Sequence, residues 1–371
     1  MIANGTTLRA NHYSQAMHTF FDRLGLSAPI VQAPMAGVQN HRLAAAVCQA
    51  GGLGSVPAAM LGPQELQAEL SALQALTDRP FNVNFFCHAE PVPDAARQAR
   101  WRAALAPSYA AMGLDANAVP SGPGRVPFGD EAAEVLEAFK PAVVSFRFGL
   151  PSADLLRRVK SWGSRVLSSA TTVSEGLWLQ AQGADAVIAQ GLEAGGHRGM
   201  FLSEDLATQT GTQTLLPALV QALAVPVIAA GGVVSAADIA AARALGAAGV
   251  QMGTAYLCSD EATTSALHRA ALQSDAAQHT ALTNVFTGRP ARGIVNRVMR
   301  ELGPMSEAAP AFPLATVALA PLRAAAEARG SSDFSPLWSG QNNAGLRAQS
   351  AGLITRDAIQ AWLDAGTKKA A

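Results

Sequence analysis

The sequence predicts an α/β fold, a (β/α)8 TIM barrel with an added helical substrate-capping domain. Eight short apolar runs alternate with alanine-rich helical segments. Most of these runs are apolar at nearly every position, which is typical of parallel strands covered by helices. The first run is followed by APMAGVQN and not by the Gly-x-Gly-x-x-Gly pattern of a doubly wound dinucleotide-binding sheet. The barrel is therefore favoured over the doubly wound alternative.

The predicted strands follow one another in the order that a barrel requires. They are the segments 29–35, 52–59, 80–86, 142–149, 165–171, 184–191, 225–232 and 249–257. Helices that begin at a polar or glycine residue are predicted between several of them, and most end in glycine. These helices are the segments 40–52, 62–78, 152–163, 172–183 and 235–246.

Two interruptions of this alternation define the predicted domains. Residues 1–264 are expected to form the barrel, with a helical and loop insertion at about 88–140 that separates the third and fourth strands. After the eighth strand the sequence shows helical patterns and no further strand. Residues 265–345 are therefore expected to be a helical substrate-capping domain, and 346–371 a C-terminal helix.

Composition excludes several classes of protein. Lys and Arg together number 27, as do Asp and Glu, so the formal net charge is zero and a nucleic-acid partner is not expected. No apolar run reaches the ~18 residues of a membrane helix, and the N-terminus lacks the apolar segment of a signal peptide. Cys48, Cys87 and Cys258 are interpreted as reduced core residues. We expect a cytoplasmic protein, and a homo-oligomer remains open.

The ends of the last two strands predict a phosphate site. Active sites of such barrels lie at the C-terminal ends of the strands, and the loops after strands seven and eight frequently bind phosphate. Here Gly231 and Gly232 end the seventh strand, and Gly253 and Thr254 lie near the end of the eighth. A helix that begins at Ser235 would add its N-terminus. The alternative is that these glycines only relieve crowding at tight turns.

Polar residues inside two strands suggest a flat heterocyclic ligand. Asn82 and Gln190 stand in otherwise apolar runs, and their amides can both donate and accept hydrogen bonds along the edge of a flavin. The small residues Ala33, Ala36 and Gly37 would let such a ring lie close to the backbone. The alternative is that each amide is a core residue bonded to backbone.

His197 is the candidate catalytic residue. It follows the sixth strand, and glycines at 195, 196 and 199 leave it without a bulky neighbour in the sequence, so we expect it to be exposed. An imidazole can take a proton or present a positive charge near neutral pH. The alternative is a loop histidine with no role. No metal is predicted, because no second ligand stands at suitable spacing. His88 is a weaker site candidate, and the other histidines, including His268, are expected to be surface or helix-capping residues.

Seven motifs follow one another along the chain. They are QAPMAGV at 32–38, FNVNFF at 81–86, SFRFGLP at 145–151, QGLEAGGHRG at 190–199, AAGGV at 229–233, QMGTAY at 251–256 and FTGRPARGIVNR at 286–297. Together these motifs, over about residues 25–345, resemble the nitronate monooxygenases, formerly called 2-nitropropane dioxygenases, of the class I type. EAGGH alone is less specific, because a family of flavin-dependent enoyl-carrier-protein reductases is similar there.

The resemblance implies a cofactor and a reaction. The cofactor is FMN, bound non-covalently in the barrel. The reaction oxidises alkyl nitronates, such as propionate 3-nitronate, with dioxygen to a carbonyl compound and nitrite, through one-electron transfer to the flavin. His197 matches the active-site histidine, which would orient an anionic nitronate and act as base for a neutral nitroalkane. The expected FMN contacts are Ala33, Pro34, Met35, Asn82, Gln190, Gly195, Gly196, Gly231, Gly232, Gln251, Met252, Gly253 and Thr254.

The sequence departs from the family at Arg147, where the motif SFxFG often has histidine. An arginine stays protonated, so it cannot act as a base. We predict that it binds a nitronate or a carboxylate of the substrate through its paired N–H groups. The alternative is a surface arginine paired with a helix carboxylate.

Two other functions remain open at this point. One is an NAD(P)H-dependent flavin reductase of enoyl thioesters or quinones on the same barrel. The other is a non-catalytic barrel that binds a phosphate ligand, since fold alone does not imply function.

Overall fold

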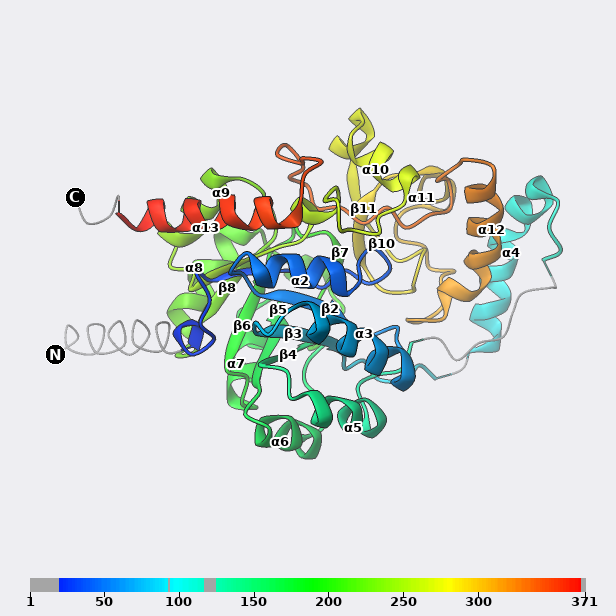
Figure 1. Ribbon diagram of the computed structural model, residues 1–371. Helices are drawn as coiled ribbons and strands as arrows, with labels where there is room; N and C mark the ends of the chain where they lie inside the picture. The colour runs from blue at the N-terminus through cyan, green and yellow to red at the C-terminus, as the bar shows by residue number, and fades with distance from the viewer. Residues whose placement is uncertain (1–19, 93, 117–124, 368–371) are drawn as a thin grey trace.

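The computed structural model describes residues 20–92, 94–116 and 125–367. Eight parallel strands form one sheet in the order β1-β9-β8-β6-β5-β4-β3-β2 (Figure 1). A parallel bridge between Val31 and Leu53 joins the two end strands, so the sheet closes into the predicted (β/α)8 barrel. The strands are β1 (Ile30–Gln32), β2 (Gly54–Pro57), β3 (Phe81–Phe86), β4 (Val143–Arg147), β5 (Arg165–Ala170), β6 (Ala186–Gln190), β8 (Val227–Ala230) and β9 (Gly249–Met252).

The predicted barrel helices are present, each a few residues shorter than its sequence segment. Four of them begin after a side chain that accepts a hydrogen bond from a backbone N–H of the first turn, namely Asn40, Ser152, Thr172 and Ser235. Such caps satisfy donors that have no partner within the helix. The helices are α2 (His41–Gln49), α3 (Pro63–Leu76), α6 (Ala153–Ser161), α7 (Val173–Ala181) and α9 (Ala236–Ala244), and α8 (Thr212–Ala222) joins them.

The interior of the barrel is filled at its N-terminal end. Because successive strand residues point to opposite faces, Val143 and Leu167 lie in one apolar cluster with Phe20 and Phe21, which precede β1. Their neighbours along the strands pack outward against the helices. Space for a ligand is therefore left at the C-terminal rim.

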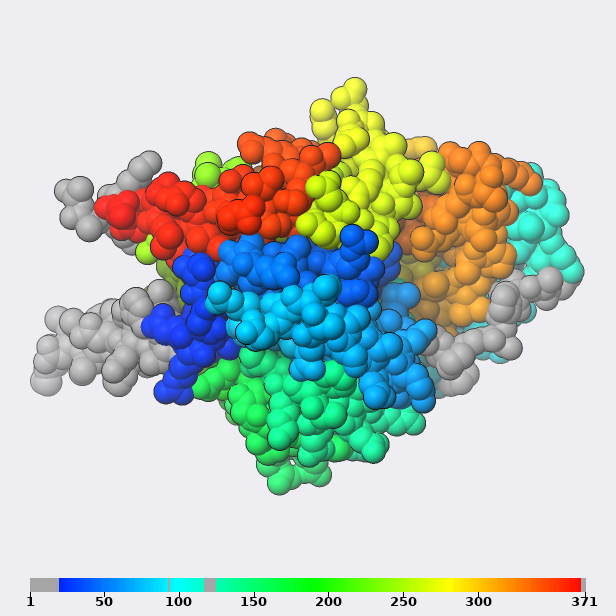
Figure 2. Space-filling model, in the orientation of Figure 1, coloured from blue at the N-terminus to red at the C-terminus, as the bar shows by residue number. Residues whose placement is uncertain are grey.

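The insertion and the segment after β9 form one lobe with its own core. Helices α4 (Ala95–Met112) and α12 (Ala315–Ala328) lie side by side at one end of the molecule (Figures 1 and 2). Trp101 Nε1 donates to the carbonyl of Ala315 at 3.2 Å, and the Tyr109 hydroxyl to that of Ala318 at 2.6 Å. The remaining helix of the insertion, α5 (Asp130–Phe139), packs against α3 and α6 on the barrel.

The expectation of a purely helical segment at 265–345 is wrong. It contains β10 (Thr280–Thr283) and β11 (Ala291–Ile294), which form an antiparallel sheet with β7 (Gly196–His197). The strands have only four residues each and no clear alternation of polar and apolar side chains, so periodicity could not reveal them. The helices are α10 (Ala266–Leu272), α11 (Arg297–Leu302) and α12, and the 3-10 helices of the structure are η1 (Leu206–Thr208), η2 (Thr254–Tyr256) and η3 (Asp275–Gln278).

The C-terminal helix belongs to the barrel. Helix α13 (Ala351–Thr367) packs along α9 and α2 (Figure 1) and contacts β1. The lobe at 265–345 is thus an insertion between the last strand and the last helix. Residues 368–371 of the predicted helix lie outside the described part of the chain. Among the described helices, none is long and apolar enough to span a membrane.

Candidate active site

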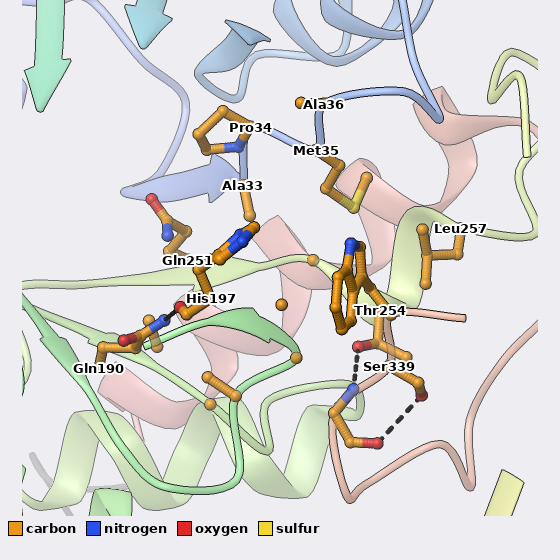
Figure 3. Close-up of a pocket in the computed structure, with 18 of the residues that line it drawn as sticks. Ala33, Pro34, Met35, Ala36, Gln190, His197, Gln251, Thr254, Leu257 and Ser339 are labelled. Carbon is orange, nitrogen blue, oxygen red and sulfur yellow. Dashed lines mark hydrogen bonds between the residues drawn. The ribbon is translucent and has the colours of Figure 1, made fainter. Parts of the chain in front are cut away.

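A pocket lies at the C-terminal rim, where the barrel meets the lobe. Including its open mouth it holds about 1170 Å³ of empty space. No Asp or Glu of the described chain lines it. The predicted site residues that line it are Ala33, Pro34, Met35, Arg147, Gln190, Gly195, Gly196, His197, Gly231, Gly232, Gln251, Gly253 and Thr254 (Figure 3).

The loop after β1 is held by a buried network of side chains. Gln39 Oε1 accepts hydrogen bonds from Gln32 Nε2 at 2.7 Å and from the backbone N–H of Met35 at 2.8 Å. Gln39 Nε2 in turn donates to the carbonyl of Ser55 at 2.6 Å. Because its bonds are satisfied inside the protein, this loop is a rigid wall of the pocket.

Asn82 lies deeper in the barrel than expected. It does not line the pocket, where Asn84, two residues nearer the strand end, is found instead. Asn82 Nδ2 donates to Ser55 Oγ at 3.0 Å, and its buried Oδ1 has no hydrogen-bond partner among the described residues. A buried acceptor without a hydrogen bond lowers the stability of the folded protein. A ligand that donates to Asn82 Oδ1 would remove this cost, so a ligand contact by Asn82 stays a prediction.

Met252 is not brought to the pocket. Its side chain lies in the core between the sheet and the helices, while Gln251 and Gly253 on either side face the pocket. The reason is the alternation of side chains along β9. The Met252 carbonyl accepts from the N–H of Ala33 at 2.8 Å, so this residue supports the β1 loop.

Gln190 uses its amide to hold the loop that carries His197. Its Nε2 donates to the carbonyl of His197 at 2.9 Å, and its Oε1 accepts from the N–H of Gly199 at 2.6 Å. The side chain still lines the pocket. Gln190 therefore stabilises the loop of His197, whether or not it also contacts a ligand.

The loops after β8 and β9, which contain Gly231, Gly232 and Gly253, form another wall of the pocket. Gly231 and Gly232 have φ of +117° and +75°, which favour glycine. The N–H groups of Gly232 and Val233 have no partner within the described chain. The N-terminus of α9 is already occupied in part, because Asp238 Oδ2 accepts from the N–H of Ser235 at 2.9 Å. Any phosphate would therefore depend on the loop N–H groups more than on this helix.

His197 is buried, contrary to the expectation of an exposed loop residue. Only 8% of it is accessible, because distant residues cover it, with the rings of Phe312 and Trp338 centred 5.5 and 5.6 Å away. The glycines next to His197 in the sequence do not cover its imidazole, but residues that are distant in the sequence do. The residue is also fixed, since β7 pairs with β11 and Nε2 lies 3.0 Å from Thr287 Oγ1. Its imidazole lies beside Ala33 in the pocket (Figure 3).

The field around His197 is positive. Burial, followed by the nearby charges of Arg125 and then Arg147 and Arg289, holds the pKa of His197 well below its usual range. Burial lowers the pKa of each of the three arginines to about 10, so all remain charged at neutral pH. None of them forms an ion pair with a carboxylate of the described residues. An anion is the ligand that compensates such charges.

Arg147 faces this pocket, and no carboxylate of the described helices pairs with it. Its Nη1 donates to the carbonyl of His197 at 2.6 Å. Replacing Arg147 with Ala should raise KM for an anionic nitronate by about 10-fold or more, since a hydrogen bond to a charged group contributes about 1.5–3 kcal/mol, and should lower kcat less. Steady-state kinetics would measure both, with exposed Arg157→Ala as control. An unchanged KM would show that Arg147 only supports the loop.

Several residues of the site were not anticipated. Arg125 lies in a turn-rich segment where nothing in the sequence distinguishes it from a surface arginine. Arg289 belongs to the motif at 286–297, but nothing in that motif indicates that it lies close to His197. Trp338, Ser339 and Asn342 come from the segment before α13, and Asn342 Nδ2 reaches the carbonyl of Gly232 at 2.8 Å. A search for polar residues at strand ends could not find these positions, because they lie in the lobe.

His268 is a buried residue of the pocket wall, which corrects the expectation of a surface position. Its Nε2 donates to the Trp338 carbonyl at 3.1 Å, and burial lowers its pKa to about 4.

The His268 pKa predicts acid destabilisation. Because the folded pKa lies below the unfolded value near 6.5, its stability contribution is complete above pH 6.5 and declines as pH falls toward 4, by up to about 1.4 kcal/mol per pH unit. The free energy of unfolding should therefore fall more steeply between pH 6.5 and 4.5 in the wild type than in His268→Gln. Denaturant titrations at several pH values would measure this, and equal slopes would contradict it.

The fold and the site together define a (β/α)8 barrel with a buried, positively charged pocket at its C-terminal rim. A family model described as nitronate monooxygenase matches residues 18–357. A nitronate monooxygenase of Paraburkholderia phytofirmans is 43% identical over 86% of this chain and 87% of its own. One from Pseudomonas aeruginosa is 40% identical over 91% and 97%. The chain belongs to the nitronate monooxygenase family, a family of flavin-dependent oxidoreductases.

Solved structures agree with this assignment. Nitroalkane oxidase from Streptomyces ansochromogenes superposes with a TM-score of 0.85 at 38% identity, over 95% of this chain and 99% of that one. FabK from Thermotoga maritima gives a TM-score of 0.70 at 27% identity, over 94% and 97%. The family and the first of these structures support oxidation of nitronates or nitroalkanes as the reaction class.

Proposed function

We propose that this protein oxidises alkyl nitronates, such as propionate 3-nitronate, with FMN and dioxygen to a carbonyl compound and nitrite. The observation that carries the proposal is the charge of the pocket. Three arginines surround His197, and among the described residues none of them pairs with a carboxylate and no Asp or Glu lines the cavity. A nitronate is a small anion, whereas the chain as a whole is neutral, so the attraction is local.

The residues present fit FMN. Within the described chain, the N–H groups of Gly232 and Val233 have no partner and could bind a phosphate. The buried Asn82 Oδ1, which has no partner among the described residues, could accept a hydrogen bond from a heterocycle that reaches deeper into the barrel than the pocket wall. A Cβ on Gly253 would lie 3.3 Å from that of Ala33, so a larger residue there would narrow the space beside β1. When bound, FMN supplies an electron acceptor and a site of reaction for dioxygen.

The protein's own groups would bind and orient the nitronate. Burial and the nearby arginines hold the pKa of His197 well below its usual range, which favours the neutral imidazole. A neutral imidazole still carries one N–H, which it can offer to a nitronate oxygen. Arg147 would attract the same anion and hold the His197 loop. The rings of Phe148, Phe312 and Trp338 exclude water around the imidazole, which strengthens these interactions.

An absorption spectrum of the purified protein tests the proposal. We expect flavin bands, and their change on anaerobic addition of propionate 3-nitronate but not of NADPH. Air should then restore the bands and release nitrite, which a colorimetric assay measures. Bleaching by NADPH alone would favour the flavin reductase. A colourless protein that FMN does not reconstitute would favour a phosphate-binding barrel.

A further inference from the structure

Thr287 contacts one ring nitrogen of His197 and does not itself line the pocket. Its hydroxyl oxygen lies 3.0 Å from His197 Nε2, and the residue is buried. The other ring nitrogen, Nδ1, has no hydrogen-bond partner among the described residues and is not enclosed, unlike Nδ1 of His88. One nitrogen of His197 is thus held by the protein, and the other is left for a ligand.

The position of Thr287 is fixed by the turn between β10 and β11. The N–H of Gly288 donates to the carbonyl of Asn284 at 2.7 Å. Gly288 has a φ of +89°, and a Cβ there would lie 2.2 Å from the Pro310 carbonyl oxygen, so no other residue fits this close approach. The Asn284 side chain in turn donates to the Ser306 carbonyl at 2.9 Å. Thr287 is therefore held rigidly against the imidazole.

The bonds around the hydroxyl favour one position for its proton. The N–H of Arg289 donates to Thr287 Oγ1 at 3.4 Å and occupies one of the two lone pairs of this oxygen. The hydroxyl proton has two acceptors to choose from, His197 Nε2 at 3.0 Å and the Arg289 carbonyl at 3.4 Å. The shorter contact is the stronger hydrogen bond. A neutral imidazole that accepts at Nε2 carries its proton on Nδ1.

We propose that Thr287 is a positioning residue that fixes neutral His197 as the Nδ1–H tautomer and so presents an N–H donor to the pocket. This inference rests on the proposed function in one respect, since the donor serves an anionic substrate such as a nitronate. A lone pair at Nδ1 would instead repel a nitronate oxygen. Second-shell groups of this kind set the tautomer and orientation of a functional histidine.

The matched variants are Thr287→Val, which keeps the shape but removes the hydroxyl, and Thr287→Ser, which keeps the hydroxyl. We expect kcat/KM for propionate 3-nitronate to fall by about 10- to 100-fold in T287V and by less than about threefold in T287S. Flavin content and melting temperature of the two variants should agree. Equal losses in both, or none in T287V, would overturn the proposal.

A spectroscopic readout decides the inference without activity. Long-range ¹H–¹⁵N correlation spectra of the histidine-labelled holoprotein distinguish protonated from unprotonated ring nitrogens, and His197→Ala assigns the signals. We expect a protonated Nδ1 and an unprotonated Nε2 in the wild type. The opposite pattern overturns the tautomer assignment even if T287V does not fold. A wild type that oxidises no nitronate but shows the expected pattern would defeat the proposed function and leave the tautomer assignment standing.

Discussion

Replacement of His197 by Ala should lower kcat/KM for an alkyl nitronate by about 100- to 1,000-fold, the effect of removing one preorganised donor from a buried active site. The environment explains the size of the effect. Only 8% of the residue is accessible, and aromatic rings surround it, so water cannot easily replace the lost N–H. Stopped-flow kinetics under anaerobic conditions would measure the loss in the step that reduces the flavin.

The control for this prediction is His279→Ala, because His279 is exposed and lies outside the pocket. It should leave kcat/KM unchanged. Flavin content should also be the same in both variants, since the glycine loops and not the imidazole are proposed to hold FMN. A His197→Ala enzyme with activity within threefold of the wild type would remove His197 from the reaction.

The barrel could be predicted because each of its parts has a local signal. Continuous apolar runs such as 184–191 are characteristic of strands buried on both faces, and capping residues such as Ser152 and Thr172 mark helix starts. The lobe lacked such signals. Strands β10 and β11 are defined by their pairing with β7 and with each other. Pairing between distant segments cannot be predicted from the residues of either segment alone. For the same reason the sequence did not show that α4 packs against α12.

The residues of the site likewise fall into those that could be predicted from local sequence and those that could not. His197, Gln190 and the glycine pairs could be found, because a barrel brings all its strand ends to one rim. The burial of His197 could not, since Phe312, Trp338 and Thr287 reach it from the lobe. Asn82 and Met252 show a finer limit. A sequence motif identifies the strand. Which residue of that strand has its side chain in the pocket depends on how far along the strand the residue lies and on which face its side chain points.

The charge of the pocket shows why total composition says little about a site. The chain has a formal net charge of zero, yet three arginines that lie far apart in the sequence converge on one imidazole. In a buried cavity these charges are poorly screened, so they act more strongly on a bound anion than surface charges would. The structure thus supplies locally the attraction that the whole molecule lacks.

Replacement of Gly195 by Ala should weaken FMN binding by roughly 5- to 150-fold. An ideal Cβ at this position would lie 2.6 Å from the backbone N of Gly340 and from the carbonyl carbon of Ser339. Backbone cannot move aside as a side chain can, and overpacking of this kind costs about 1–3 kcal/mol of stability. We expect FMN to bind the undistorted loops, so this cost must be met again on binding and corresponds to the stated range in Kd. Relief of the clash must displace either the loop of His197 or the segment 338–342, and both line the pocket.

Gly62→Ala is the matched control, because it adds the same methyl group at an ordinary φ of −71° with no contact shorter than 3.8 Å. FMN titration of the apoprotein, followed by flavin fluorescence, would give Kd for both variants. Gly340 N also donates to Thr254 Oγ1 at 2.9 Å, so a shift at residue 340 would disturb the loop after β9 as well. Wild-type affinity in Gly195→Ala would mean that FMN does not depend on this contact, and that the phosphate is held elsewhere on the rim.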